Sequence, residues 1–237
     1  MIKAMFDELL AEGISRYLPG CRYGEDAEGY ARITQDLGRR RLGSVLSEEL
    51  RAHIRGEAGE LSTVVLVDIE SLGFIGRPLF LIGALHARTQ GERWGLELVQ
   101  YLARDYSEEE AVLEAFLREA SPADLWITYN GRTFDLPFIR LRTIHYRLAE
   151  PEPPCHLDLL PVARRRWGAS LPDCRLKTIE RMISGRPRIA SDIAGARIPA
   201  AYHDFVRTGE PLEMIDILKH NALDLLGLLD LYQMLMR

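Results

Sequence analysis

The sequence predicts an α/β fold built on a mixed five-stranded sheet that helices flank. Two observations predict it. Apolar, β-branched runs at 63–69, 79–86 and 94–102 are typical of strands, and short polar or Gly/Pro-containing links separate them. After residue 107, helical patterns alternate with further short apolar runs, as in a sheet with parallel crossovers.

The first three strands should form an antiparallel meander. A parallel crossover needs about a dozen residues or more, and the links after residues 69 and 86 are too short to supply one.

The second half of the sheet should be a βαβαβ unit with right-handed crossovers. A helix with Ser107 as its cap and acidic residues in its first turn is predicted to run to about residue 119. A strand at 124–130, a helix at 136–147 and a short strand at 155–158 follow. Further helices are predicted at 159–167, 175–184, 200–207 and 212–236.

Residues 1–60 have a weaker pattern. Helical periodicity covers 5–10 and 46–54, and Ser47 is a suitable N-cap for the second segment. Glycines and a run of arginines lie between the two. We therefore expect an N-terminal helical or irregular extension at 1–60 and one domain at 61–237.

Composition excludes several classes. The net charge of −5 argues against a protein that holds nucleic acid by global charge alone, although a metal enzyme concentrates acids at its site. No apolar run approaches the ~20 residues of a membrane span, so no membrane association is expected. The N-terminus lacks a signal-peptide core, and three scattered cysteines form no disulfide or zinc framework. A cytoplasmic, reduced protein is expected.

The first strand ends in two carboxylates, Asp68 and Glu70. Alternate strand residues share a face, so these side chains should project together, about 6–7 Å apart. Burying two unpaired acids is unfavourable, whereas divalent cations make such a pair stable and useful. The pattern favours a metal-dependent active site.

Two other segments carry acids in related positions. Asp135 follows a strand end and begins a helix, so it would lie at a carboxyl edge of the sheet, although an ordinary N-cap has the same pattern. His220 and Asp224 are one turn apart on the last helix and can face one cavity, although a surface pair would look the same.

Together these motifs resemble the DEDD (DnaQ-like) 3′–5′ exonucleases of the ribonuclease H-like superfamily, and in particular the bacterial YprB-type ribonuclease H-like domain. The resemblance covers about residues 62–236. Three motifs carry it. They are Asp68-Ile-Glu70, Asn130-Gly-Arg-Thr-Phe-Asp135-Leu-Pro137 and His220-Asn-Ala-Leu-Asp224, with further similarity at 175–180 and 192–199.

The resemblance implies a site for two Mg²⁺ or Mn²⁺ ions. Asp68 would bridge them, Glu70 and Asp224 would complete one site, and Asp135 would support the other. His220 would orient or deprotonate the attacking water. Its spacing to Asp224 is the one the superfamily usually gives to tyrosine, so the assignment of the base stays open.

The implied activity is 3′–5′ exonucleolytic hydrolysis of single-stranded DNA or RNA. Four residues are predicted to contact the substrate: Asn130, Phe134, Arg175 and Lys177. Asp158 is interpreted as a helix cap. Two alternatives stay open, a nucleic-acid-binding or interaction module of the same fold with weak catalysis, and a metal-dependent endonuclease. The sequence leaves DNA versus RNA and the oligomeric state undetermined.

Overall fold

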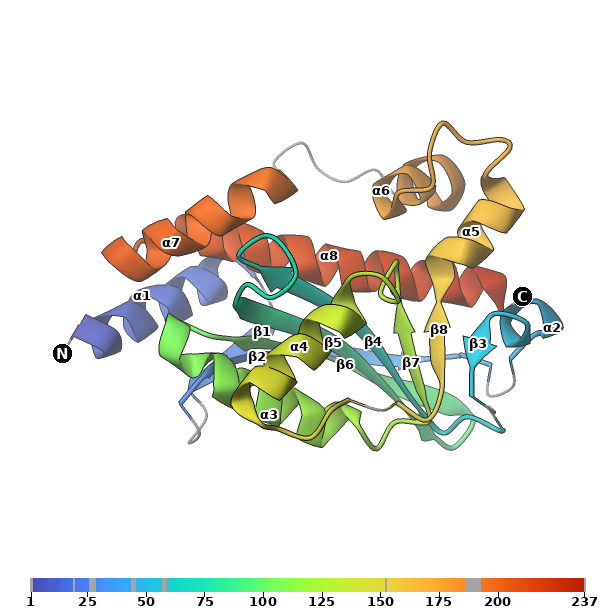
Figure 1. Cartoon of the computed structure of the whole chain (residues 1–237), viewed down its shortest axis with the longest axis horizontal. Helices are drawn as coiled ribbons and strands as arrows, with labels where there is room; N and C mark the ends of the chain where they lie inside the picture. Colours follow the sequence, from blue (N-terminus) through green and yellow to red (C-terminus); the bar gives the residue numbers. More distant parts are fainter. Residues whose placement is uncertain are drawn as a thin grey trace.

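A computed structural model gives the architecture (Figure 1). It describes residues 2–18, 20–25, 29–43, 46–56, 59–151, 153–185 and 193–236. Within these ranges one mixed sheet of eight strands has the order β1-β2-β6-β5-β4-β7-β8-β3. Helices pack on both of its faces (Figure 1). The α/β prediction is confirmed.

The five predicted strands form the centre of this sheet. They are β4 (Thr63–Ser71), β5 (Leu79–Gln90), β6 (Arg93–Leu102), β7 (Leu125–Thr128) and β8 (His156–Asp158). β4, β5 and β6 pair antiparallel, while β7 pairs parallel with both β4 and β8. The predicted meander and βαβαβ pairing are therefore both present.

The N-terminal sixty residues differ from expectation because they add three strands, so the sheet is not five-stranded. β1 (Cys21–Glu25) and β2 (Ala31–Arg40) extend one edge, and β3 (Ile54–Arg55) extends the other. The two expected helices are α1 (Ile2–Tyr17) and the short α2 (Glu48–Arg51). Most side chains of β1 and β2 are partly or fully exposed, so these strands lack the long apolar runs that revealed the central ones.

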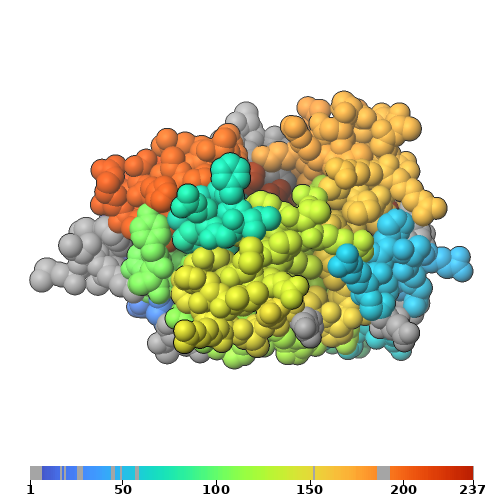
Figure 2. Space-filling model, viewed as in Figure 1, coloured from blue at the N-terminus to red at the C-terminus, as the bar shows by residue number. Residues whose placement is uncertain are grey.

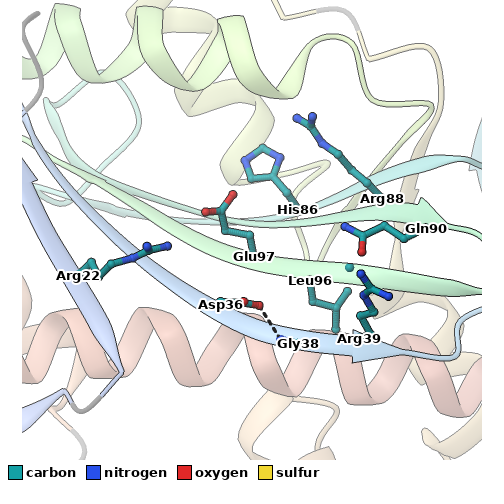
Figure 3. Close-up of a pocket in the computed structure, with 10 residues that line it drawn as sticks. Arg22, Asp36, Gly38, Arg39, His86, Arg88, Gln90, Leu96 and Glu97 are labelled. Atoms are coloured by element: carbon teal, nitrogen blue, oxygen red, sulfur yellow. Dashed lines mark hydrogen bonds between the residues drawn. The ribbon is translucent and has the colours of Figure 1, made fainter.

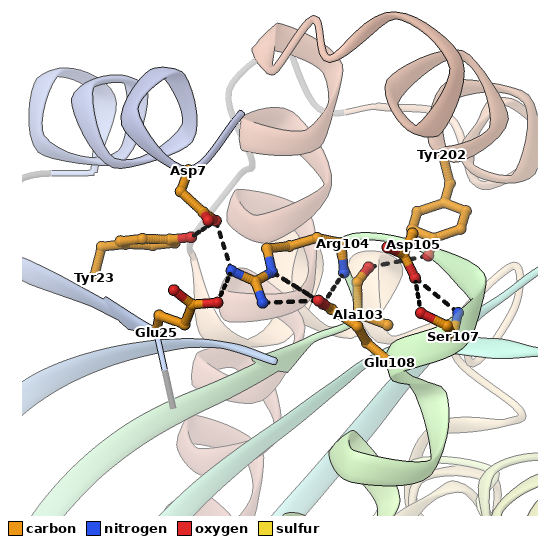
Figure 4. Close-up of polar contacts among 9 residues, drawn as sticks. All are labelled: Asp7, Tyr23, Glu25, Ala103, Arg104, Asp105, Ser107, Glu108 and Tyr202. Atoms are coloured by element: carbon orange, nitrogen blue, oxygen red, sulfur yellow. Dashed lines mark hydrogen bonds and ion pairs between the residues drawn. The ribbon is translucent and has the colours of Figure 1, made fainter. Parts of the chain in front are cut away.

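A buried ionic cluster ties this N-terminal segment to the central sheet (Figure 4). The Arg104 guanidinium, 3% exposed, donates to Asp7 of α1 at 2.7 Å and to Glu108 at 2.7 Å. Glu25 of β1 lies 2.9 Å from the same guanidinium. Tyr23 donates to Asp7 at 2.6 Å. Because three acids surround one arginine, the cluster orders α1 and β1 against the end of β6.

The helices cover the two faces of the sheet in a way that follows strand alternation. Val65 and Val67 of β4 pack in the core cluster that includes α3 (Glu109–Ala120) and α4 (Asp135–Tyr146). Leu66, which points the other way, packs with the second half of α8 (Leu212–Leu235). The buried apolar residues of its second half explain why α8 lies directly on the sheet (Figure 1).

The remaining helices form the upper rim in Figure 1. They are α5 (Leu159–Trp167), α6 (Leu176–Ile179) with a π-helical continuation to Ser184, and α7 (Ile198–Thr208). Asp158 is the N-cap of α5, as predicted. Among the described helices, none combines the length and the hydropathy needed to cross a bilayer.

Glu109, at the start of α3, connects three parts of the fold although its side chain is only 1% exposed. Arg142 of α4 donates to its two carboxylate oxygens at 2.6 and 2.7 Å. The Tyr146 hydroxyl donates to it at 2.9 Å and the backbone amide of Leu79 at 2.8 Å. Every interaction at this carboxylate is with a donor, so the buried charge is well compensated.

Candidate metal and nuclease site

Asp68 and Glu70 project from β4 into one cavity. Burial raises the pKa of Asp68 well above its usual value, and the nearby carboxylates of Asp224, Glu70 and Asp135 raise it further. The Asn221 side chain amide donates to Asp68 Oδ2 at 2.8 Å, which favours the charged form and opposes this shift. Both side chains therefore project from the same face of β4, as predicted, and line the same cavity.

The last helix brings the third motif to the same place. His220 and Asp224 both line the cavity, and His220 Nε2 lies 3.3 Å from Asp224 Oδ2. His220 is 7% exposed. The one-turn spacing on α8 therefore directs both side chains to the carboxylates of β4, as the sequence predicted.

A second set of contacts sets the distance between α8 and the sheet. Gln100 of β6 donates to the Asn221 Oδ1 at 2.8 Å, and the Asn221 amide also donates to the backbone oxygen of Asp68 at 3.1 Å. Gly83 pairs with Asp68 across β4 and β5. A Cβ at Gly83 would stand 2.1 Å from Asn221 Oδ1, so only glycine leaves room for this amide.

Asp135 is the first residue of α4 and is 4% exposed. Burial raises its pKa to about 7, and the charges of Asp158 and Asp224 act in the same direction. Backbone amides, including that of Ile69, lower it. Asp135 therefore lies within electrostatic reach of Asp224, and the four predicted acids belong to one cluster.

Asp158 holds the loop that leads into Asp135. Its carboxylate accepts from the backbone amides of Asn130 at 2.8 Å and Arg132 at 3.1 Å, besides capping α5 through Leu160 at 3.0 Å. Asn130 has a positive φ of 68°. The hydrogen bonds from the Asn130 and Arg132 amides explain how Asp158, at the end of β8, stabilises the left-handed turn after β7.

The cavity between these elements has a volume of about 260 Å³. Figure 2 shows the hollow between α7, the loop after β4 and the start of α4. The residues that line it are Asp68, Ile69, Glu70, Ser71, Gly73, Phe134, Gly195, Ile198, Pro199, His220 and Asp224. Its floor is acidic, and its rim is mostly apolar.

A larger cavity of about 570 Å³ lies elsewhere, over β1, β2, β5 and β6 (Figure 3). Arginines 22, 39 and 88 line it together with Asp36 and Glu97. Opposite charges alternate there, so they partly compensate one another. It contains none of the predicted site residues.

The predicted substrate residues separate into two groups. Phe134 lines the acidic cavity and is 39% exposed. The Asn130 side chain accepts from the Thr133 hydroxyl at 2.8 Å and so stabilises its own loop. Arg175 and Lys177 belong to the N-terminus of α6 and are not part of the described lining. Asp192, which begins one of the motif stretches, lies outside the described residues.

Sequence reasoning missed two features of the site. The first is Asn221, which lies between the motif residues His220 and Asp224. Its 2.8 Å hydrogen bond to Asp68 could not be predicted, because a polar residue in a helix does not indicate which distant strand it contacts. Phe74, 89% exposed, stands in the loop after β4 between Gly73 and Gly76, which both have positive φ. An aromatic residue between two glycines beside a catalytic motif could have indicated it.

The donor set suits divalent cations, since buried carboxylates that raise one another's pKa need positive charge nearby. Among the described residues, no three His, Cys, Asp or Glu side chains stand close enough to hold an ion together as they are placed. The chemistry of the residues therefore fits a metal, and their side chains would have to converge on it.

Comparison with known proteins follows the same segment. A family model described as the RNase H superfamily matches residues 65–236. An uncharacterized protein YprB of Bacillus subtilis (strain 168) is 35% identical over 162 residues, which cover 68% of this chain. The match spans 38% of that relative's length.

One solved structure shows a similar fold, and a second gives a weaker match. The family B DNA polymerase from the archaeon Pyrobaculum calidifontis superposes with a TM-score of 0.58 at 14% identity, over 87% of this chain and 29% of the polymerase. An apo exonuclease I matches with a TM-score of 0.41 at 21% identity, over 67% of this chain and 44% of its own.

Proposed function

This chain belongs to the RNase H superfamily, and on that premise we propose that it is a metal-dependent nuclease acting as a 3′–5′ exonuclease on single-stranded DNA or RNA. Membership of the superfamily supports a nuclease. The exonucleolytic direction, the metal and the residue roles are our proposal.

One observation carries it: Asp68, Glu70 and Asp224 line one small cavity, and the carboxylate of Asp135 lies close enough to raise the pKa of Asp68. The charges that raise the pKa of Asp68 are those of three other carboxylates. Carboxylates that raise one another's pKa are unfavourable for stability, because each disfavours the charged form of the next. Retaining them is consistent with a role in binding cations.

Asp68, Glu70, Asp135 and Asp224 would hold two Mg²⁺ or Mn²⁺ ions. When bound, such ions stabilise charge on the attacking and leaving oxygens of a phosphodiester. Asn221 fixes the orientation of the Asp68 carboxylate through its 2.8 Å hydrogen bond. Gln100 in turn fixes Asn221.

His220 would hold or remove a proton from the attacking water. Histidine is the side chain that most often transfers protons in catalysis at neutral pH. In this structure its Nε2 lies 3.3 Å from Asp224, so the same carboxylate that is proposed to bind metal also orients the ring. His220→Gln should therefore lower the rate more than it weakens metal binding.

The shape of the site favours a strand end. A 260 Å³ cavity is at or below the size of small-molecule sites and accepts about one nucleotide unit. Phe134 lines it and the exposed Phe74 lies beside it, and both rings are available to stack on unpaired bases. Stacking of this kind requires a single-stranded end.

The test is incubation of purified protein with 5′-labelled single- and double-stranded DNA and RNA, with Mn²⁺ or with EDTA. A ladder that shortens from the 3′ end by single nucleotides, only with metal, is expected. Internal cuts would replace the exonuclease with an endonuclease, and no metal-dependent cleavage of any substrate would contradict the proposal.

A binding module of the same fold is the second candidate. It is favoured by the absence, within the described residues, of three side chains already positioned around an ion. Oligonucleotide binding without cleavage, at any Mn²⁺ concentration that the protein tolerates, would support it over the enzyme.

A further inference from the structure

A second cavity, of about 420 Å³, lies on the other side of the 130–137 loop from the carboxylates. Arg55 of β3, Arg132 of the loop and Arg140 of α4 line it, and it shares no described lining residue with the acidic site. Every charged residue of its described lining is an arginine. A concentration of guanidinium groups in one hollow favours an anionic ligand.

Arg132 is held in place but has a donor to spare. Its Nη2 donates to the backbone oxygen of His53, and its backbone amide donates to Asp158 at 3.1 Å. Its Nε is buried and, within the described part of the chain, has no hydrogen-bond partner. A buried guanidinium nitrogen without an acceptor is unfavourable, and a ligand oxygen would satisfy it.

The electrostatics of His156 agree with a cationic hollow. Burial lowers the pKa of His156 to about 4, and the charges of Arg132 and Arg55 lower it further against the opposing effect of Asp158. His156 is therefore neutral at pH 7, and its Nε2 contacts the Thr128 hydroxyl at 2.9 Å. The positive charge of the cavity thus comes from the arginines alone.

The other walls are rigid and apolar. Pro151, Pro153 and Pro154 line one side, and Leu136 and Pro137 from the first turn of α4 line the other. Proline rings lose little conformational entropy when a ligand packs on them. Arginines beside such walls match a phosphate whose attached sugar or base lies against an apolar surface.

We propose that this arginine-lined cavity binds a backbone phosphate of the nucleic-acid strand whose 3′ end occupies the acidic site. The inference rests on the proposed function. Arg140 is five residues along α4 from Asp135, about 7–8 Å of helix rise, so α4 joins the two cavities. Phosphate contacts position a strand without reading its sequence, which suits a nuclease that acts on any base.

Arg140 already has one acidic neighbour, and this offers a test with the opposite sign. Its Nε lies 2.6 Å from Glu150, and the two side chains are 64% and 38% exposed. Exposed ion pairs are weak and screened by salt, so a phosphate can compete with Glu150. Removing Glu150 should strengthen the binding of nucleic acid.

The experiment measures the affinity of a 5′-fluorescent 15-nucleotide single strand by anisotropy in EDTA, over a series of salt concentrations. Arg55→Glu/Arg140→Glu should weaken binding about tenfold and lower the slope of log affinity against log salt by about 1.4, for two lost contacts on a single strand. Both positions are exposed, so the fold should persist. Glu150→Gln should tighten binding about twofold.

Arg93→Glu, one charge reversal at an exposed position at the start of β6, is the control for a reversal outside the cavity and should change affinity less than twofold. Double-variant binding within twofold of wild type would overturn the phosphate site, whatever the cleavage assay shows. Wild-type binding that the double variant weakens, together with no metal-dependent cleavage, would overturn the proposed function and keep the phosphate site. Failure of wild-type protein to bind the strand would overturn both.

Discussion

Glu109 and Asp68 are acidic side chains whose neighbours differ in kind. Glu109 accepts hydrogen bonds from an arginine, a tyrosine and a backbone amide. Asp68 receives the amide of Asn221, but its strongest charged influences are three other acids. The first arrangement is what stability requires, and the second departs from it.

The comparison distinguishes acids that stabilise the fold from acids that we propose bind metal. The Arg104 cluster follows the pattern of Glu109, since one buried arginine is surrounded by acids of the opposite sign (Figure 4). At the acidic cavity we propose that bound divalent cations supply the positive charge. The following variants test that distinction, beginning with the largest expected effect.

Asp68→Asn should lower metal-dependent hydrolysis about 10³-fold, the size of loss expected when a group that supports transition-state charge is removed. In EDTA its melting temperature should rise, because the variant removes one acid from a cluster of four. Glu92→Gln, an acid-to-amide change at an exposed turn, is the control and should change neither. Full activity in the Asp68 variant would exclude it from the site.

Glu109→Ala should reduce the free energy of unfolding by about 3–5 kcal/mol, because it leaves Arg142 buried without its acid. Urea denaturation measures this value. Glu114→Ala, at an exposed position of the same helix, should stay within about 0.5 kcal/mol of wild type. Equal effects of the two changes would show that the Glu109 contacts contribute little.

Mn²⁺ should stabilise the wild-type protein by about 2.7 kcal/mol at a concentration one hundred times its Kd, or about 5–10 °C in melting temperature. Differential scanning fluorimetry follows the shift. Asp68→Asn/Asp224→Asn should lose most of it, whereas Glu109→Ala should melt lower and keep the increment. A shift that survives in the double variant would locate the ion elsewhere.

His86 adds a third kind of buried group, one that burial keeps uncharged. Burial lowers its pKa to about 4, against about 6.5 in an unfolded chain, so the unfolded state binds the proton first as pH falls. Stability should therefore decrease from pH 6.5 toward pH 4, with about 2 kcal/mol from His86 between pH 7 and 5. In His86→Leu, the free energy of unfolding measured by urea denaturation should fall by that much less between pH 7 and 5. If it falls as steeply as in wild type, His86 is not the cause.

The sequence predicted the parts of the fold that carry long apolar runs. β4 to β8 and α8 lie within a few residues of their predicted bounds because burial on a sheet or along a helix face leaves a clear periodicity. β1 and β2 were not predicted, because their mostly exposed side chains give only a short apolar pattern. Their place in the sheet depends on pairing with β6, which no local pattern contains.

The same reasoning holds for the site. Asp68, Glu70, His220 and Asp224 line one cavity, as their motifs predicted, because strand alternation and helix periodicity determine direction. Asn221 and Gln100 were not predicted, since their contact depends on the packing of α8 over Gly83. The arginine-lined cavity could not be predicted, because Arg55 and Arg140 meet only through the pairing of β3 with β8.

The hydrogen bond from Asn221 to Asp68 joins residues 153 positions apart in the chain. Contacts of such long range form late, after the intervening segments have been made and folded. During synthesis on the ribosome, the strands of the sheet emerge well before α8 does. The nascent chain therefore carries Asp68, Glu70 and Asp135 before Asp224 and His220, and the proposed nuclease activity should begin only once the last helix has docked.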